Sequence, residues 1–137
     1  MQEVIIFTND NGGVSVCIPT GELEIEQVLA KDIPAGKQGF IIDAATLPES
    51  DNDFFDAWEQ TEGVVTVNVS KAREITKTRL RIERAPLLAA QDVAFQRAQE
   101  TGASTADIVT EKQRLRDITK LADAAQSLSD LRAIKVT

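Results

Sequence analysis

Apolar and polar positions follow a strand-like order in the first half of the chain. A short apolar run at Val4–Phe7 and a second at Val14–Ile18 flank Asn9–Gly13, a segment of residues that tolerate positive φ. Two β-rich runs around such a segment predict a β-hairpin. Apolar residues then recur at helical spacing, which predicts a short helix over 24–31 with acidic residues in its first turn.

Two further strands are predicted, at 39–43 and at 63–69, with an acidic loop before the second. Asp51 or Asp53 is expected to cap a short helix over Phe54–Trp58. We expect this helix to lay its aromatic side chains on the sheet as core. The alternative, left open here, is that Phe54, Phe55 and Trp58 form a partner contact.

From Ser70, a natural N-cap, the spacing turns helical and predicts a long helix over 71–99. Ile75, Ile82 and Ala89 recur every seven residues on it. Pro86 lies inside this stretch, with no neighbouring Gly or Asn to cap a break. We therefore expect one bent, continuous helix rather than two helices.

A second helix is expected to follow a short connection, so that the two helices form an antiparallel pair. Gly102 lies where the first helix should end, and Ser104 or Thr105 should cap the second, which runs to Ile118. Residues 121–127 are expected to be a small-residue linker. Ser127 or Ser129 should then cap a terminal helical turn through Ile134.

Strands come before helices along the chain, and this segregation predicts an α+β fold. The predicted architecture is a small antiparallel β-rich domain with short helices over 1–70. A helical hairpin with a C-terminal helical turn follows over 71–137.

Charge is distributed as unevenly as the secondary structure. The chain has a net charge of −7, but residues 1–70 hold 13 acidic residues and two lysines, a net charge of −11. Residues 71–137 hold 13 basic residues and nine acidic ones, a net charge of +4. This split suggests attraction between the halves or a charged partner at one end. Nucleic acid is disfavoured as a partner, because the overall sign is wrong and no aromatic residues lie among the bases.

Residues suited to catalysis are scarce. The chain has no His and no Tyr, so the arrangements built on a His base or ligand are excluded, and its glycines form no phosphate-binding loop. We expect no enzyme activity and no cofactor. The densest carboxylate group, at Asp51, Asp53 and Asp56, departs from the calcium-loop pattern, and we interpret it as a solvated acidic loop rather than a metal site.

Other features indicate the compartment. Cys17, the only cysteine, lies between two apolar residues and is expected to be a buried thiol in a reducing compartment. No apolar run is long enough to span a membrane, and the first residues lack the basic region of a signal peptide.

Basic residues on the predicted helical pair form its most distinctive feature. Their simplest interpretation is a solvated face with local ion pairs. The alternative is that reciprocal Arg–carboxylate pairs between the two helices fix their register. The residues that would form or surround such a helix-pair contact are Arg81, Arg84, Leu87, Leu88, Asp92, Leu115, Arg116 and Asp117.

The same residues carry a resemblance. Arg81-x-x-Arg84-x-x-Leu87-Leu88-x-x-x-Asp92, followed by Lys112-Gln113-Arg114-Leu115-Arg116-Asp117-Ile118, resembles the C-terminal helical pair of tail fibre assembly proteins and tail assembly chaperones of tailed bacteriophages. The similarity covers about 40 residues. It departs from the family pattern where Val93 replaces a Trp, Lys112 a Tyr and Thr119 a Pro.

The resemblance implies a phage tail-module protein that is made in the host cytoplasm and acts by binding other tail or fibre proteins. The first hypothesis is a structural component of the virion near the tail tip or fibres. The second is a transient chaperone, which an exposed apolar stripe on the long helix would favour. Self-association through the stripe of Ile75, Ile82 and Ala89 is a further hypothesis.

Overall fold

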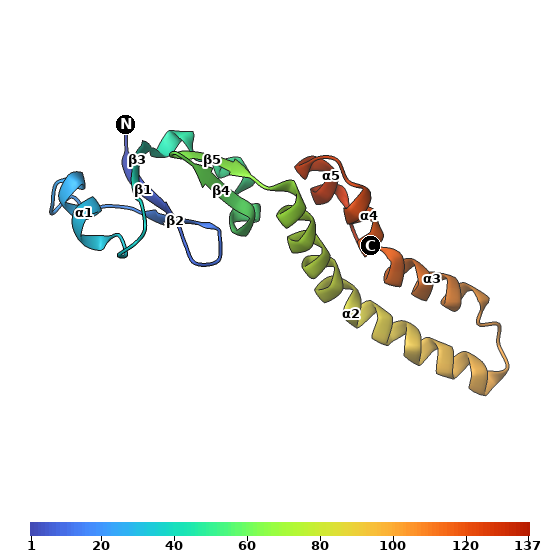
Figure 1. Ribbon diagram of the computed structural model, residues 1–137. Helices are drawn as coiled ribbons and strands as arrows, with labels where there is room; N and C mark the ends of the chain where they lie inside the picture. The colour runs from blue at the N-terminus through green and yellow to red at the C-terminus, as the bar shows by residue number, and fades with distance from the viewer. The chain divides into compact units, whose positions relative to one another are not determined.

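Antiparallel sheets form the N-terminal half of the chain and helices form the C-terminal half, so the predicted α+β class is confirmed (Figure 1). The computed structural model describes all residues, 1–137. Contacts divide them into two units, Met1–Ala72 and Arg73–Thr137, which we call the β unit and the helical unit.

The first sheet has three strands in the order β2-β1-β3. Its central strand β1 (Glu3–Thr8) pairs antiparallel with β2 (Val14–Cys17) and with β3 (Phe40–Asp43). The predicted hairpin and third strand are therefore confirmed. The hairpin turn is closed by Asn9, whose Oδ1 accepts hydrogen bonds from the backbone N–H groups of Asn11 and Gly13.

The predicted short helix is confirmed as α1 (Ile25–Asp32). Glu24 and Gln27 form a capping box at its N-terminus, in which the backbone N–H of Glu24 donates to Gln27 Oε1 at 3.1 Å. Val28 is the buried residue of the helix.

The second sheet is a hairpin of β4 (Trp58–Thr61) and β5 (Val64–Val67). β5 confirms the strand predicted at 63–69. The sequence pattern did not predict β4, because Trp58-Glu-Gln-Thr is too short and too polar to be recognised as a strand.

The short helix predicted over Phe54–Trp58 is present but has other bounds, because it is a 3₁₀ helix that begins at Glu49 and ends at Ala57. Two 3₁₀ segments, Ala44–Thr46 and Glu49–Ala57, occupy this region, and the second follows Pro48 and ends where β4 begins. Asp43 caps the first segment by accepting from the backbone N–H of Ala45, and the residue at the N-cap of the second segment is Pro48 rather than Asp51 or Asp53.

The core of the β unit lies between the two sheets, around Ile6, Val14 and Trp58. Val16, Phe40, Ile42, Leu47, Val65 and Val67 pack against these three residues. Each sheet thereby covers the apolar face of the other, which neither two nor three short strands could bury alone.

The long helix α2 (Val69–Thr101) is one continuous helix that contains Pro86, as the sequence predicts. Its middle section is bent in Figure 1, as expected where the Pro86 ring meets the preceding turn. The helix begins before the predicted cap Ser70. Asn68 caps it instead, since its Oδ1 accepts from the backbone N–H of Lys71 at 3.0 Å.

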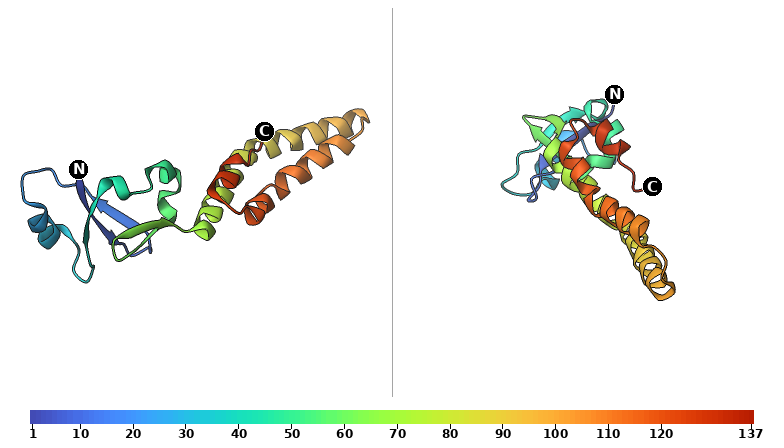
Figure 2. Two further views of the ribbon diagram at one scale, coloured as in Figure 1. Left: turned by 90° about the horizontal axis from the view of Figure 1, so that it is seen from above. Right: turned by 90° about the vertical axis from the view of Figure 1, so that its right-hand side faces the viewer.

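Three helices follow α2, namely α3 (Ala106–Asp117), α4 (Thr119–Ala124) and α5 (Leu128–Ala133). α3 runs antiparallel to α2, and both views in Figure 2 show the two helices side by side. Gly102, with φ 73°, ends α2, and the N–H of Ala103 donates to the carbonyl of Ala98. Ser127 caps α5 as predicted, whereas the linker predicted at 121–127 is mostly the helix α4.

No helix is both long and apolar enough to cross a membrane. Cys17 is a free thiol at the end of β2 and is half-buried.

The turn between β4 and β5 offers a test of the hairpin. Glu62 (φ 49°) and Gly63 (φ 85°) both have positive φ, the geometry of a type I′ turn, which favours Asn-Gly. Replacing Glu62→Asn should therefore stabilise the chain by about 0.5–1 kcal/mol in urea unfolding, because Asn tolerates this conformation better than Glu. Glu62→Gln removes the charge without this preference and should leave stability within about 0.3 kcal/mol. Equal effects of the two substitutions would contradict the turn assignment.

Candidate interaction surface of the helical unit

α2 presents one face to α3, α4 and α5 and the opposite face to solvent. Leu80 and Ala98 on its inner face are buried with apolar residues of the shorter helices and of the C-terminal segment. These residues are Leu115, Ile118, Ala122, Ala125, Leu131, Ile134 and Val136. The inner face therefore forms the core of the helical unit.

Arg84 connects α2 to the C-terminal end of α3. Its Nη1 donates to the backbone carbonyls of Leu115 at 3.2 Å and Arg116 at 2.9 Å. The last backbone carbonyls of a helix have no N–H donor within that helix to bind. A cation beside them is also favoured by the helix dipole. Arg84 supplies α3 with both a hydrogen-bond donor for its last carbonyls and a positive charge at the negative end of its dipole.

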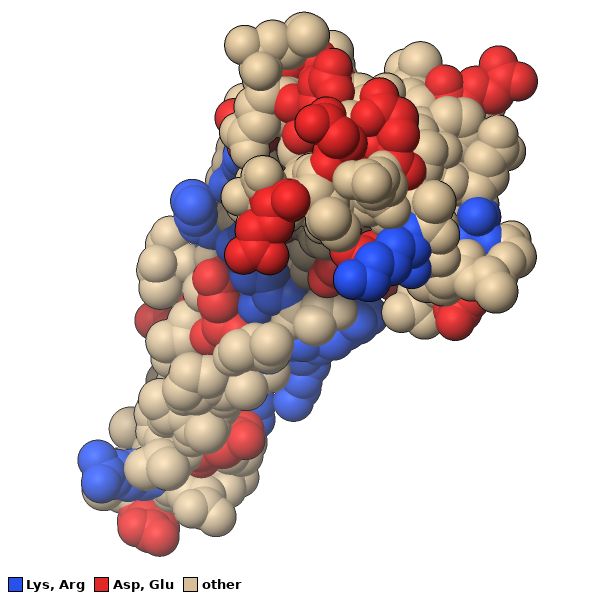
Figure 3. Space-filling model, turned by 90° about the vertical axis from the view of Figure 1, so that its left-hand side faces the viewer, with Lys and Arg blue, Asp and Glu red and all other residues tan.

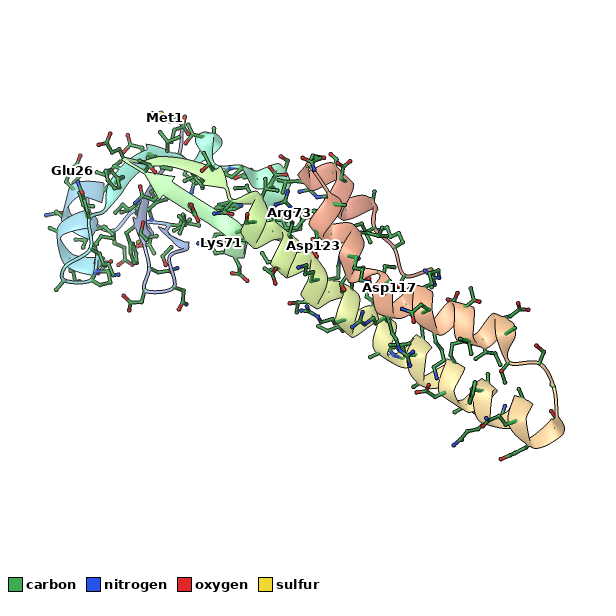
Figure 4. The ribbon with its side chains drawn as sticks, turned by 45° about the vertical axis from the view of Figure 1, so that its right-hand side comes forward. Met1, Glu26, Lys71, Arg73, Asp117 and Asp123 are labelled. Carbon is green, nitrogen blue, oxygen red and sulfur yellow. The ribbon has the colours of Figure 1, made fainter.

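Two more arginines of α2 repeat this arrangement at the other short helices. Arg73 donates from Nε and Nη2 to the carbonyl of Ala125, the residue that ends α4, at 3.2 and 2.9 Å. Arg79 donates from Nη2 to the carbonyls of Leu131 and Ile134, at the end of α5. Figure 4 shows Arg73 at the start of α2, on the side of the C-terminal helices. The C-terminal carbonyls of each of the three shorter helices thus accept hydrogen bonds from an arginine of α2.

Ion pairs add to these contacts. Lys112 of α3 lies 2.6 Å from Asp92 of α2 and 5.1 Å from the centre of the Phe95 ring. Lys77 pairs with Asp123 of α4, which Figure 4 labels, and with Glu74. The hydrogen bonds that the Lys77 ammonium donates to these carboxylates, to Asp123 above all and then to Glu74, raise the pKa of Lys77.

The structure brings together only some of the residues predicted for the helix-pair contact. Arg84, Asp92 and Leu115 take part in it, and Leu87 and Leu88 are half-buried. The predicted Arg–carboxylate pairing is wrong. Arg84 binds backbone carbonyls, Asp92 binds a lysine, and Asp117 accepts from Gln113 and pairs with Lys120, both near it in sequence.

Arg81 and Arg116 are exposed, and neither forms an ion pair. Arg116 contributes its backbone carbonyl to the contact rather than its guanidinium. For these two side chains, the simpler interpretation of a solvated charge holds.

The outer face of α2 carries an apolar stripe. Ile82 is 70% exposed and Val93 is 46% exposed, and the smaller residues between them on this face are exposed as well. We call this set the outer stripe: Ile82, Ala85, Pro86, Ala89 and Val93. Apart from the adjacent Ala85 and Pro86, successive members lie three or four residues apart, so they fall on one side of the helix, opposite the buried Leu80 and Ala98.

The aromatic cluster of the β unit divides between core and surface. Phe54 and Trp58 are buried, and Trp58 Nε1 donates to the carbonyl of Asp51 at 3.2 Å. Phe55 is 36% exposed, and its ring centre lies 4.8 Å from that of Trp58. Of the three residues considered as a partner contact, Phe55 alone presents its ring to solvent.

The structure contains no candidate metal site beside these surfaces. No group of three or more His, Cys, Asp or Glu side chains is arranged to hold a metal ion. The cavity beside Phe55, of about 260 Å³, is lined by asparagine, glycine and valine residues and by Asp56. Figure 3 shows acidic side chains grouped on the β unit, in keeping with its 13 acidic residues and three lysines.

Comparison with protein-family models, with curated proteins and with solved structures finds no match. The resemblance of the helical pair to phage tail fibre assembly proteins therefore rests on the residues of the chain alone, and remains a hypothesis.

The contact between Arg84 and α3 predicts different effects for two arginines one turn apart. Arg84→Ala should destabilise the chain by about 1–3 kcal/mol in urea unfolding, because two carbonyls lose a charged donor. Arg81→Ala should change stability by less than about 0.5 kcal/mol, since Arg81 is exposed. If both variants lose the same stability, the assigned role of Arg84 is wrong.

Acid should weaken the helical unit. The hydrogen bond from Arg114 lowers the pKa of Glu111, and hydrogen bonds from Gln113 and Lys120 lower that of Asp117. A carboxylate whose pKa is lowered on folding stabilises the fold above its ordinary pKa, and this contribution is lost as the pH falls through the folded value. The melting temperature should therefore begin to fall below about pH 4.5, the ordinary pKa of Glu, and continue to fall below 3.8, that of Asp. Thermal unfolding followed by circular dichroism from pH 7 to pH 2.5 measures this effect. A melting temperature that stays constant to pH 3 would count against these pairs.

Proposed function

We propose that this chain is a structural component of a bacteriophage tail that acts by protein–protein association near the tail tip or the fibres. The outer stripe of α2 is the surface through which it binds. In this role the inner face of α2 builds the helical unit and its outer face meets the partner.

The single observation that supports association most strongly is the exposure of the outer stripe in an otherwise well-satisfied structure. No buried side-chain nitrogen or oxygen lacks a hydrogen-bond partner. In contrast, Ile82 and Val93 leave large apolar side chains in water on a single helix face. A contiguous exposed apolar surface with charged neighbours is typical of a protein-binding site.

Support for the phage tail comes from the resemblance of the helical pair. Arg84, Asp92 and Leu115, which belong to the similar motif, make contacts between α2 and α3. The motif therefore coincides with residues that hold the pair together, which is a sound reason for a family to retain it.

A transient tail-assembly chaperone is the second candidate, and one observation favours it. The outer stripe is exposed in the isolated chain, as a surface that covers a client temporarily should be. We prefer the structural component because the stripe is narrow and has only two large apolar members. Arg81 and Asp92 border it on one flank, which suits a contact of fixed register better than a broad client surface.

Mass spectrometry of purified phage particles tests the proposal directly. We expect the chain in particles at a constant copy number relative to the major tail proteins. Its absence from particles would overturn the structural role and leave the chaperone.

A matched pair of variants tests the surface. Replacing Ile82→Ser together with Val93→Ser should lower the number of incorporated copies at least about tenfold, because the stripe loses both large side chains. Val109→Ser on α3, which is 50% exposed but outside the stripe, should leave incorporation unchanged. Equal incorporation of both variants would contradict the assigned surface.

A further inference from the structure

The outer stripe has an internal symmetry that points to its occupant. The symmetry belongs to four of the five residues of the outer stripe, without Ala85: Ile82, Pro86, Ala89 and Val93 follow one another at spacings of four, three and four residues. This order is the same in both directions along α2. The residues are large at both ends and compact in the middle, so the stripe matches a reversed copy of itself in shape.

We infer that the partner of the outer stripe is α2 of a second copy of this chain, packed antiparallel across a twofold axis between Leu87 and Leu88. This inference rests on the proposed function, because it names the protein that the stripe binds. In such a pair, Ile82 faces Val93 of the second copy, and Pro86 faces its Ala89. These positions have the a and d spacing of a coiled coil, and compact residues at the centre let the two backbones approach closely.

Charges beside the stripe complement each other in this arrangement. Arg81 and Asp92 lie eleven residues apart, which places them on one flank of the helix. In the antiparallel pair, Arg81 comes within about 3 Å, along the helix axis, of Asp92 of the second copy. The twofold axis repeats this contact, so both unpaired arginines gain a carboxylate. Asp92 can accept them, because its side chain is 63% exposed despite its contact with Lys112.

The antiparallel direction is favoured over the parallel one by the charge of the β unit. The β unit has 13 acidic side chains and three lysines, a net charge of −10, and joins the N-terminal end of α2. A parallel pair would attach two such units to neighbouring helix ends, where they would repel each other. An antiparallel pair separates those helix ends by about 50 Å, well beyond the screening length at physiological salt.

The oligomeric state of the full chain is the first test. Sedimentation equilibrium should give a mass twice that of the 14.9 kDa chain, and Ile82→Ser should raise the dimer dissociation constant roughly tenfold or more. Val109→Ser, outside the stripe, is the matched control and should leave the constant unchanged. A monomer at all concentrations up to the millimolar range overturns the inference. If the chain is monomeric but present in particles, the inference of a dimer fails and the proposed function stands. If the chain is dimeric but absent from particles, the inference of a dimer stands and the proposed function fails.

A charge exchange tests the direction of the helices. Arg81→Glu alone and Asp92→Arg alone should each weaken the dimer, because like charges then face each other twice. An equimolar mixture of the two variants should restore it, since every introduced charge meets an opposite one in the antiparallel pair. Failure of the mixture to exceed both single variants rejects the antiparallel contact.

Cysteine pairs give a geometric test in a Cys17→Ser background. An oxidised mixture of Ile82→Cys and Val93→Cys chains should form the mixed disulfide in large excess over either symmetric one. A predominance of the symmetric Ile82→Cys disulfide would show a parallel pair and overturn the inference.

Discussion

The helical unit depends on arginine side chains of α2 that donate hydrogen bonds to the C-terminal backbone carbonyls of the helices packed against it. α4 and α5 have six residues each and α3 has twelve, lengths at which helices are not stable alone in water. Their terminal carbonyls would also lack partners at a packed interface. Arg73, Arg79 and Arg84 supply those partners, so that one long helix organises three short ones.

This arrangement explains why the basic residues of α2 are not simply a solvated face. The guanidinium group offers several donors in a fixed plane, and can therefore bind carbonyls at a helix end while its stem packs along the interface. With the inner face used in this way, the outer face is left to Arg81 and to the apolar stripe. This division between a packed inner face and an exposed outer face is the structural feature on which the proposed association rests.

Sequence patterns predicted the α+β class, the first hairpin and the continuous helix through Pro86, and they narrowed the cap of the last helix to Ser127 or Ser129, because each depends on local spacing or on a single turn residue. They missed β4 and α4, whose short, mixed sequences become regular only through packing. They also assigned carboxylates as the partners of Arg84. Its true acceptors are backbone carbonyls of Leu115 and Arg116, which no side-chain pattern reveals. The exposure of Ile82 could not be predicted without knowing which face of α2 packs against α3, since the apolar character of Ile82 alone favours burial.

The central claim is that the outer face of α2 becomes covered on assembly while the rest of the helical unit stays as it is. Thiol labelling tests it most directly, with single cysteines introduced by Val93→Cys or Val109→Cys in a Cys17→Ser background. Both sites should react rapidly with a maleimide in the dilute chain, because both side chains are exposed. In assembled tails, the account predicts that labelling at position 93 is suppressed while labelling at position 109 is unchanged. Equal reactivity of position 93 before and after assembly would contradict it.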